Sequence, residues 1–246
     1  MAGRAIAVTV AALSQAGRRE PNEDAFGYWE GAGCLVAVLC DGAGGHGGGQ
    51  VAARVAVTHV LEAFALRPEV SASTLHALAR SANEAVIARQ VPGAATADMR
   101  TTIVVLLLDL YSGAALWAHA GDSRLYHWHD ARLLGRTRDQ SLEERLRDAG
   151  LSATDAAPGQ LTSALGSPEG FDLAVLDAPH MLGSGDALLL CSDGLWSAID
   201  DAAMASSVAG CGGPRAWLDR LEAGVQRADH SDQDNYSALA IWCAAG

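Results

Sequence analysis

The sequence lacks several features that would assign it to a functional class directly. It has five cysteines, an odd number with no CxxC spacing, which indicates reduced and mostly buried thiols of a cytosolic protein. Its 17 basic residues are outnumbered by 29 acidic ones, and the net charge of −12 argues against nucleic acid as the main partner. No apolar run approaches the roughly 18 residues needed to span a membrane, so we expect a soluble cytoplasmic protein without a membrane partner.

The chain is long enough for one large domain or two small ones. Half of its 246 residues are apolar, which is enough for a sizeable core. No internal repeat and no linker divides it, so we expect a single domain over residues 1–246, and a monomer. The stretch at residues 4–13 could pass for a weak secretory signal, but it leads directly into a polar motif and is more typical of a first strand.

Hydrophobic periodicity places groups of strands apart from pairs of helices. Two neighbouring helices are expected at residues 51–65 and 73–90, because apolar residues recur there at helical spacing and Pro68 and Pro92 follow them. Such grouping favours antiparallel sheets with helices outside over a parallel βαβ sheet. Further helices are expected at 141–150, 200–209 and 214–228. The expected strands are 5–13, 25–29, 35–40, 101–110, 114–120, a hairpin at 124–134 turning near Asp130, 171–179, 187–191 and 236–243.

The apolar run LVAVLC at residues 35–40 ends at Asp41 and passes into a glycine-rich loop. A run without alternation is typical of a buried strand, so the carboxylate of Asp41 is expected at a strand end. The glycines at 42–49 would let a small charged ligand approach the main chain. The loop alone leaves three interpretations open: a cation site, a D-G hairpin turn, and a dinucleotide site, since residues 42–47 also spell GxGxxG. The dinucleotide interpretation is weakened because Asp41 would point an anion at the pyrophosphate.

Asp41 is one of several acids at expected strand ends. Asp122 and Asp193 also follow strands, and Asp193 is followed by glycine as Asp41 is. If antiparallel strands bring these ends together, about five or six acids share one cleft, where like charges repel unless cations are bound. The histidines give no convincing zinc spacing, since His127 and His129 alternate in an expected hairpin, and oxygen ligands favour Mg²⁺ or Mn²⁺. The acids that would precede strands are Glu23, Asp24, Asp232 and Asp234.

Six motifs, in order along the chain, resemble the motif set of the PP2C-type metal-dependent protein serine/threonine phosphatases, with the bacterial branch the most similar. Six motifs in the family's order are far more specific than any one alone. The resemblance implies an α+β fold, a four-layer αββα sandwich of two packed antiparallel sheets flanked by helix pairs. The motifs are REPNED (19–24), DGAGGH (41–46), GDSR (121–124), LTSALG (161–166), CSDGLW (191–196) and DN (234–235).

The resemblance also implies a centre of two Mn²⁺ or Mg²⁺ ions at one end of the sandwich. In the family's scheme Asp41 would bridge both metals, and Gly42 would offer its carbonyl to one of them. Asp193 and Asp234 would complete the ligands of the other.

Four more residues and one segment receive roles from the same resemblance. Glu23 and Asp24 would hold metal-bound waters, Asp122 would help to bind a third, weaker metal, and Arg19 would bind the substrate phosphate. A flap beside the cleft is implied at about residues 137–170. This flap matches an aperiodic stretch at 151–170, and we expect substrate selection to reside there.

Departures from the family's pattern concern the general acid and the flap. Animal members place a histidine after the first Asp-Gly as the proposed general acid, whereas this chain has Ala43. Protonation of the leaving alkoxide would then fall to a metal-bound water or, as a weak candidate, to His46, which is more typical of a loop-structuring residue. RTT at 100–102 replaces Gly-Thr-Thr, and DQS at 139–141 replaces Asp-His-Ser; neither change affects an implied metal ligand.

The implied activity is hydrolysis of phosphoserine and phosphothreonine in proteins by in-line attack of a hydroxide held by the two metals, opposing a bacterial Ser/Thr kinase and acting on its targets. An alternative is a catalytically inactive relative that keeps the fold as a regulatory or phosphoprotein-binding module. Loss of a metal acid would mark such a relative, and every expected acid is present. A dinucleotide-binding oxidoreductase is a third hypothesis, which rests on the GxGxxG letters alone.

Overall fold

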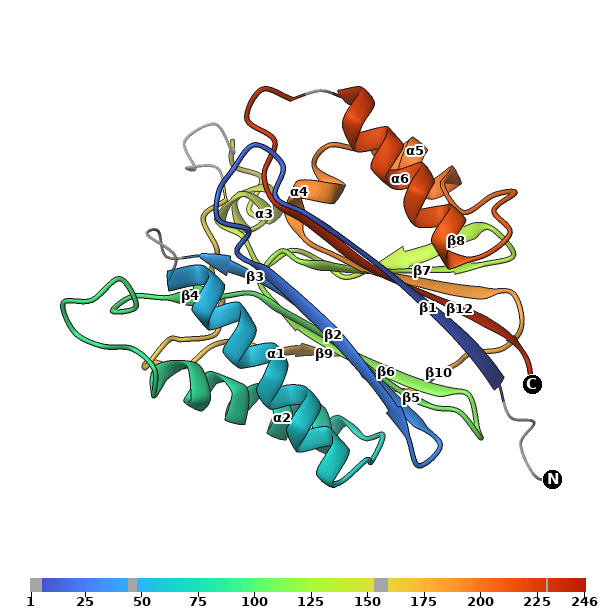
Figure 1. The fold of residues 1–246 in the computed structure, drawn as a ribbon, viewed down its shortest axis with the longest axis horizontal. Coiled ribbons are helices and arrows are strands. Elements are labelled where there is room, and N and C mark those ends of the chain that lie inside the picture. Colours follow the sequence, from blue (N-terminus) through green and yellow to red (C-terminus); the bar gives the residue numbers. More distant parts are fainter. Residues whose placement is uncertain (1–5, 44–47, 153–158, 229) are drawn as a thin grey trace.

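The structure is a computed structural model that describes residues 6–43, 48–152, 159–228 and 230–246. Two antiparallel sheets pack face to face (Figure 1). The five-stranded sheet has the order β1-β12-β11-β7-β8, with strands β1 (Ile6–Gln15), β12 (Tyr236–Ala245), β11 (Asp186–Cys191), β7 (Arg124–His129) and β8 (Arg132–Arg136). The seven-stranded sheet has the order β10-β6-β5-β3-β2, with β4 paired to β3 and β9 to β6. Its strands are β2 (Asp24–Gly31), β3 (Cys34–Ala43), β4 (Arg100–Thr101), β5 (Ile103–Asp109), β6 (Ala114–Ala120), β9 (Ala174–Val175) and β10 (His180–Met181).

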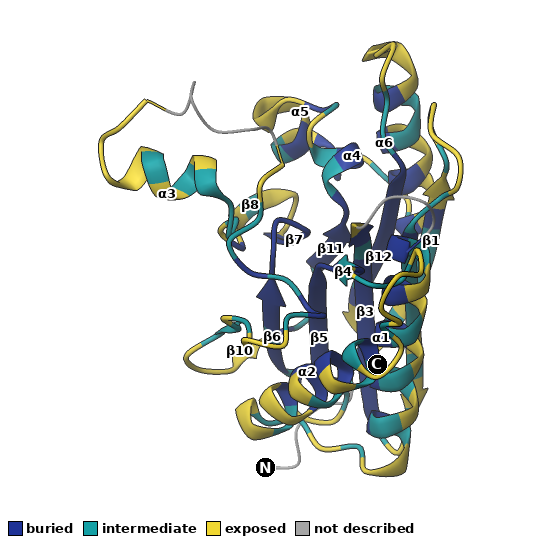
Figure 2. Ribbon diagram, turned by 90° about the vertical axis from the view of Figure 1, so that its left-hand side faces the viewer, coloured by how far each residue is buried: buried dark blue, intermediate teal, exposed yellow. Residues whose placement is uncertain are grey.

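Helices cover the outer faces of both sheets, which gives the four layers that the sequence led us to expect (Figure 1). Helices α1 (Gly48–Leu66) and α2 (Ala72–Ile87) pack on the seven-stranded sheet. Helices α5 (Asp201–Ser206) and α6 (Pro214–Ala228) pack on the five-stranded sheet. Two short helices, α3 (Leu142–Asp148) and α4 (Asp193–Trp196), lie at one end of the sandwich (Figure 2). The predicted α+β sandwich is confirmed.

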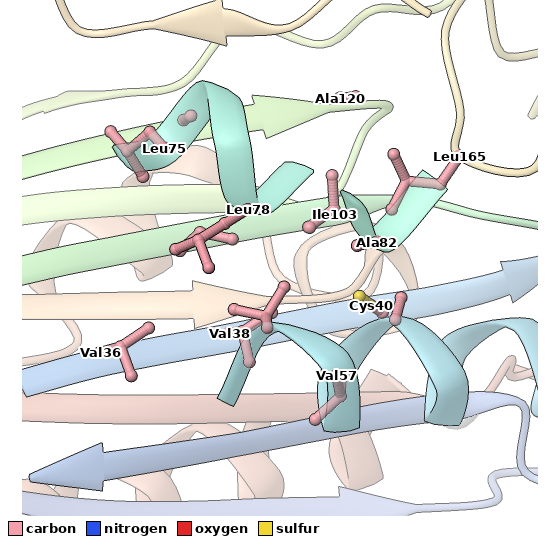
Figure 3. Close-up of a cluster of buried hydrophobic side chains, with 14 of the residues drawn as sticks. Val36, Val38, Cys40, Val57, Leu75, Leu78, Ala82, Ile103, Ala120 and Leu165 are labelled. Carbon is pink, nitrogen blue, oxygen red and sulfur yellow. The ribbon is translucent and has the colours of Figure 1, made fainter. Parts of the chain in front are cut away.

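Strand β3 shows why an apolar run without alternation marks a strand buried on both faces. Val36, Val38 and Cys40 belong to the apolar cluster that the sheet forms with α1 and α2 (Figure 3). Leu35 and Leu39 point the other way, into the cluster between the two sheets. All five side chains are fully buried, so neither face of the strand needs polar residues.

Side-chain caps set where several helices begin. The hydroxyl of Ser71 accepts a hydrogen bond from the backbone N–H of Thr74 (3.1 Å) before α2, and that of Ser141 accepts one from Glu144 (3.2 Å) before α3. Each cap satisfies a backbone donor that the first helical turn would otherwise leave unpaired. None of the helices in the described part of the chain has the length and apolar character needed to cross a bilayer.

The N-terminal stretch and the hairpin agree with the sequence-based expectation. The described part of residues 4–13 belongs to β1, which pairs with β12 along its whole length. Asp130 and Ala131, between β7 and β8, both have positive φ (46° and 64°), as a two-residue hairpin turn requires.

The expectation was wrong mainly at element ends. The helix expected at 73–90 ends at Ile87, and the strand expected at 171–179 shrinks to β9, which pairs only with Ala118 and His119 of β6. Residues 193–196 form α4, which the sequence did not predict. Segments this short contain too few residues for hydrophobic periodicity to identify them.

Candidate metal centre

The acids from several strand ends meet at one end of the sandwich. Asp24 begins β2 and lies opposite Asp41 in the pairing of β2 with β3. Asp193 follows β11 and begins α4, and Asp122 lies between β6 and β7. Each of these carboxyl groups is close enough to another for their charges to interact, and Asp234 interacts with Asp24 and Asp193 in the same way. We call these five residues the acidic cluster.

Burial and mutual repulsion change the proton affinity of the acidic cluster. Burial raises the pKa of Asp24 to about 6 and the pKa of Asp122 to about 7, and neighbouring carboxylates add to both increases. Burial, followed by the charges of its neighbours, raises the pKa of Asp41 well above the ordinary range. Burial also raises the pKa of Asp193, whose side chain is hydrogen-bonded to that of Asp41. Carboxyl groups crowded in this way hold either protons or cations.

Two buried oxygen atoms at this site lack any hydrogen-bond partner: Oδ1 of Asp24, which belongs to the cluster, and Oε1 of Glu23, the residue before it. The other carboxyl oxygen of Asp24 is satisfied, because it accepts a hydrogen bond from the hydroxyl of Ser192 (2.8 Å). Unpaired buried oxygens cost free energy and are rare in native proteins unless a ligand, ion or water completes them. The acidic cluster and these two oxygens therefore fit a cationic ligand with its own waters.

The donor set also indicates which kind of cation fits. Among the residues that the structure describes, no three His, Cys, Asp or Glu side chains converge as a ready-made metal cage. The donors are carboxylate oxygens, partly exposed to solvent at Asp41 and Asp193. This arrangement suits hard ions that keep several waters, as Mg²⁺ does, and it does not suit structural zinc.

Hydrogen bonds hold the main chain at Asp41, and the residues that make them were not predicted from the sequence. The carbonyl of Asp41 accepts from the hydroxyl of Thr101 (2.9 Å) and the backbone N–H of Thr102 (2.8 Å). The N–H of Asp41 donates to the hydroxyl of Thr102 (2.9 Å), which in turn bonds the hydroxyl of Ser123 (2.7 Å) beside Asp122. Two strand ends of the acidic cluster are thus linked through buried hydroxyl groups.

Glycine at position 42 has a packing reason. A Cβ there would lie 2.2 Å from the carbonyl oxygen of Gly49 and 2.8 Å from that of Glu23. The end of β3 therefore approaches the start of α1 so closely that a side chain would not fit. Gly42 and Gly49 thus allow close contact between two backbone segments, in addition to the ligand access that we expect from the sequence. Residues 44–47, including His46, lie outside the described residues.

Two interpretations of the glycine-rich loop are wrong. The two strands that follow α1 and α2, β4 and β5, both pair antiparallel with β3, so the parallel βαβ unit of a dinucleotide site is not formed. The loop leads from β3 into α1, which also excludes a hairpin turn between two strands.

Arg19 and Asp234 meet at the rim of the acidic cluster. Their side chains form an ion pair of 2.9 Å, in which Arg19 remains 63% exposed and Asp234 29% exposed. Asn235 holds this rim in place: its side-chain oxygen accepts from the N–H of Glu23 (2.9 Å), and its amide donates to the carbonyl of Ala16 (2.8 Å). The guanidinium is therefore accessible to an anion near the acids. Asp232 is exposed in the preceding turn.

Two cysteines flank the acidic cluster, Cys40 before Asp41 and Cys191 two residues before Asp193. Both are fully buried, and burial raises the pKa of each thiol. A thiolate is therefore strongly disfavoured, which agrees with the interpretation of both residues as inert core thiols.

The model of one known protein family, described as protein phosphatase 2C, matches residues 13–223 of the chain. The chain belongs to the protein phosphatase 2C family. The family predicted from the six motifs is thereby confirmed. Among the relatives of this PP2C chain is the serine/threonine protein phosphatase PstP of Mycobacterium tuberculosis, 28% identical over 205 residues. The match covers 82% of this chain but 39% of PstP, so the chain spans about two fifths of that relative's length.

Solved PP2C structures share the fold. The serine/threonine phosphatase of S. agalactiae matches with a TM-score of 0.81 at 24% identity, covering 96% of this chain and 99% of that one. The catalytic domain of PstP, in complex with two manganese ions, matches with a TM-score of 0.76 at 27% identity, covering 97% of this chain and 99% of that one.

Proposed function

We propose that this PP2C-family chain is a metal-dependent phosphatase that removes phosphate from phosphoserine and phosphothreonine in proteins. The observation that carries the proposal is the acidic cluster together with the two buried carboxylate oxygens, of Glu23 and Asp24, that lack a hydrogen-bond partner. The relatives support it, because PstP is a serine/threonine protein phosphatase and its catalytic domain has been solved with two manganese ions.

We assign the residues of the cluster to two Mn²⁺ or Mg²⁺ ions. Asp41 would lie between the ions, since it is in contact with Asp193 and its charge interacts with those of Asp24 and Asp122. The orphaned oxygens of Glu23 and Asp24 would accept from waters on the ions. The further ligands would be the carbonyl of Gly42, Asp193 and Asp234, with Asp122 at a third, weaker ion.

Bound divalent ions neutralise phosphoryl charge and lower the pKa of a water. The chain's own residues orient the reaction. Arg19 is paired at the rim yet well exposed, so its fork of donors could transfer to the oxygens of an entering phosphate. Thr101 and Thr102 hold the backbone of Asp41, which limits reorganisation of its carboxylate. Ala43 has no proton to donate, so protonation of the leaving alkoxide is left to a water or to His46.

The wider context is part of the same proposal. The substrates would be phosphorylated proteins, and the partner would be a Ser/Thr kinase whose products this chain dephosphorylates. We further propose that the chain acts as a monomer in the cytoplasm, and that residues 1–246 form one phosphatase domain with a flap at about 137–170.

The test is hydrolysis of a phosphothreonine peptide by the purified protein with Mn²⁺, with Mg²⁺ or with a chelator. We expect turnover that requires a divalent metal and that falls by more than about 100-fold in Asp193→Asn, because removing a ligand should cost at least as much as removing its supporting residues. Absence of turnover in every metal, with folded protein that binds the metal, would favour the inactive regulatory module instead.

A further inference from the structure

Ser192 lies between β11 and α4, and it is fully buried beside the acidic cluster. It precedes the first residue of α4, a position where a serine side chain commonly accepts from an N–H of the first helical turn. The hydroxyls of Ser71 and Ser141 do so before α2 and α3. Within the described part of the chain, the hydroxyl of Ser192 caps no N–H of α4 and instead donates to Oδ2 of Asp24 (2.8 Å). The side chain thus bonds an acid in place of its own helix.

The backbone of β12 fixes the orientation of this hydroxyl. Its oxygen accepts from the N–H of Ser237 (2.9 Å), while the N–H of Ser192 donates to the carbonyl of Ser237 (3.1 Å). A backbone N–H can only donate, so the single proton of the hydroxyl is left for Asp24. One oxygen of Asp24 is therefore held in place, whereas Oδ1 is buried and has no partner among the residues that the structure describes.

The bond between Ser192 and Asp24 also joins the two sheets. Asp24 begins β2 of the seven-stranded sheet, where it lies opposite Asp41. Ser192 follows the last residue of β11, in the five-stranded sheet, and directly precedes Asp193. The acids that the two sheets contribute to the acidic cluster are therefore tied together at Ser192.

Further polar side chains support the same carboxyl group. The side chain of Ser237 also interacts with it, and its hydroxyl shares a hydrogen bond with that of Ser14 (2.8 Å). The side-chain amide of Asn22 donates to the hydroxyl of Ser14 (2.9 Å), and its oxygen accepts from the N–H of Asp24 (3.1 Å). Asp24 is thus held through its backbone and through its side chain, which restricts rotation of the carboxyl group.

We propose that Ser192 is a positioning residue, whose hydroxyl holds the carboxyl group of Asp24 with one oxygen free for a water on a bound divalent ion. The inference rests on the proposed function for that ion. The six motifs include Ser192, but the resemblance assigns it no role. Without the hydroxyl, the carboxyl group of Asp24 could rotate, and the waters of the ions would lose a fixed acceptor. Groups that orient the surroundings of a metal in this way support its affinity.

The test compares two buried serines. Ser192→Ala removes the hydroxyl and keeps the backbone hydrogen bond to the carbonyl of Ser237. Ser207→Ala is the matched control, because the hydroxyl of Ser207 is also buried, accepts from the indole N–H of Trp217 (2.8 Å) and donates to the carbonyl of Met204 (2.7 Å). Each substitution removes one accepted and one donated hydrogen bond, but only the first takes a partner from an acid of the cluster.

Two further variants, Asp24→Ala and Asp24→Ala combined with Ser192→Ala, show which residue Ser192 acts through. If the hydroxyl acts through Asp24, its removal has no further effect once the carboxyl group is gone. Titration calorimetry with Mn²⁺ measures the affinity of each folded variant for the ion without depending on activity. Kinetics with a phosphothreonine peptide measure KM and the Mn²⁺ concentration for half-maximal turnover, and urea denaturation in chelator measures stability.

We expect Ser192→Ala to raise the Kd for Mn²⁺ by about tenfold, and the Mn²⁺ concentration for half-maximal turnover by a similar factor, the size typical of residues that support metal ligands. Ser207→Ala should change both by less than about twofold, although each substitution lowers stability by leaving buried partners unsatisfied. In the Asp24→Ala background, Ser192→Ala should change the Kd by less than about twofold. The peptide KM of Ser192→Ala at saturating Mn²⁺ should stay within about twofold of wild type, because Arg19 is not altered.

Unchanged Mn²⁺ affinity in Ser192→Ala would overturn the inference, and so would an equal loss in Ser207→Ala or in the Asp24→Ala background. If Ser192→Ala does not fold, Ser192→Cys decides by the same readouts, since a thiol is close in size but a weak donor. Wild-type protein that binds Mn²⁺ but does not hydrolyse the peptide would contradict the proposed activity alone, and the calorimetry would still test Ser192. Wild-type protein that binds no Mn²⁺ would contradict both.

Discussion

Strand β11 has an aspartate at each end: Asp186 is its first residue, and Asp193 follows its last residue by two positions. Asp186 is buried and fully paired. One of its oxygens accepts from His127 (2.9 Å) and His129 (3.0 Å), and the other accepts from the N–H of Gly183 (2.6 Å). At the other end, Asp193 is surrounded by further acids; Arg19 pairs with Asp234 at the rim, and the charge of Arg124 acts on Asp122.

The difference distinguishes a carboxylate that the protein itself satisfies from one that we propose to be a metal ligand. A buried charge that is satisfied by protein donors stabilises one geometry and needs nothing else. A cluster of carboxyl groups with raised pKa values and orphaned oxygens is incomplete without a ligand, and such clusters are typical of functional sites. The two histidines that alternate along β7 are thus partners of Asp186 and belong to the first kind.

The largest effect is expected in the acidic cluster, where a substitution should lower activity without lowering stability. Asp41→Asn should lower phosphopeptide turnover by more than about 100-fold, since it removes the central acid. In chelator the variant should be at least as stable as wild type, because a neutral amide replaces a carboxyl group whose raised pKa already favours the neutral form. Steady-state kinetics and thermal denaturation measure both. A variant that unfolds easily but keeps its turnover would show that the acids are structural.

The opposite pattern is expected at Asp186, where a substitution should lower stability but leave activity nearly unchanged. Asp186→Ala should destabilise the protein by about 3 kcal/mol, because the buried His127 and the N–H of Gly183 lose their acceptor. Turnover of the folded variant should stay within about twofold, as distant sites act independently. Urea denaturation and peptide kinetics test this, with Asp186→Asn as the milder control. Lost turnover at normal stability would remove the contrast between the two ends.

The smallest effect concerns a third kind of buried group, the imidazole of His119. Burial lowers the pKa of His119, whose Nε2 bonds the carbonyl of Arg138 (2.7 Å), while that bond and Asp139 oppose the shift. Unfolded histidine titrates near 6.5, so this contribution to stability is present above about pH 6.5 and is lost as the pH falls below it. Urea denaturation at pH 7 and pH 5 should show that the free energy of unfolding falls less for His119→Gln than for wild type. The acidic groups are the same in both proteins, so their contribution cancels in the comparison. An equal or steeper loss in the variant would contradict it.

The fold and the site differ in how much the sequence could predict. The run at β3 and the grouping of strands and helices predicted the sandwich, because burial on both faces leaves a plain apolar pattern. The acids at strand ends and the six ordered motifs pointed to the cluster and to the family before any coordinates. These signals lie within short stretches of the chain, so they can be recognised from the sequence without the structure.

The supporting contacts could not be predicted in the same way. Thr102 reaches Asp41 across 61 residues, His127 reaches Asp186 across 59, and Trp196 reaches Asp122 across 74. Periodicity says which face a residue occupies, but not which distant residue it meets. For Arg124 and Asp139 the motif letters were visible, whereas the ion pair between them required the structure.

We propose that divalent cations bind at the Asp193 end of β11, in the acidic cluster, and not at the Asp186 end. Titration calorimetry with Mn²⁺ tests it directly, using wild type, Asp41→Asn and Asp186→Ala. We predict saturable binding of about two ions to wild type and to Asp186→Ala, and loss of that binding in Asp41→Asn. Absence of saturable binding to wild type, or equal binding by Asp41→Asn, would contradict the account.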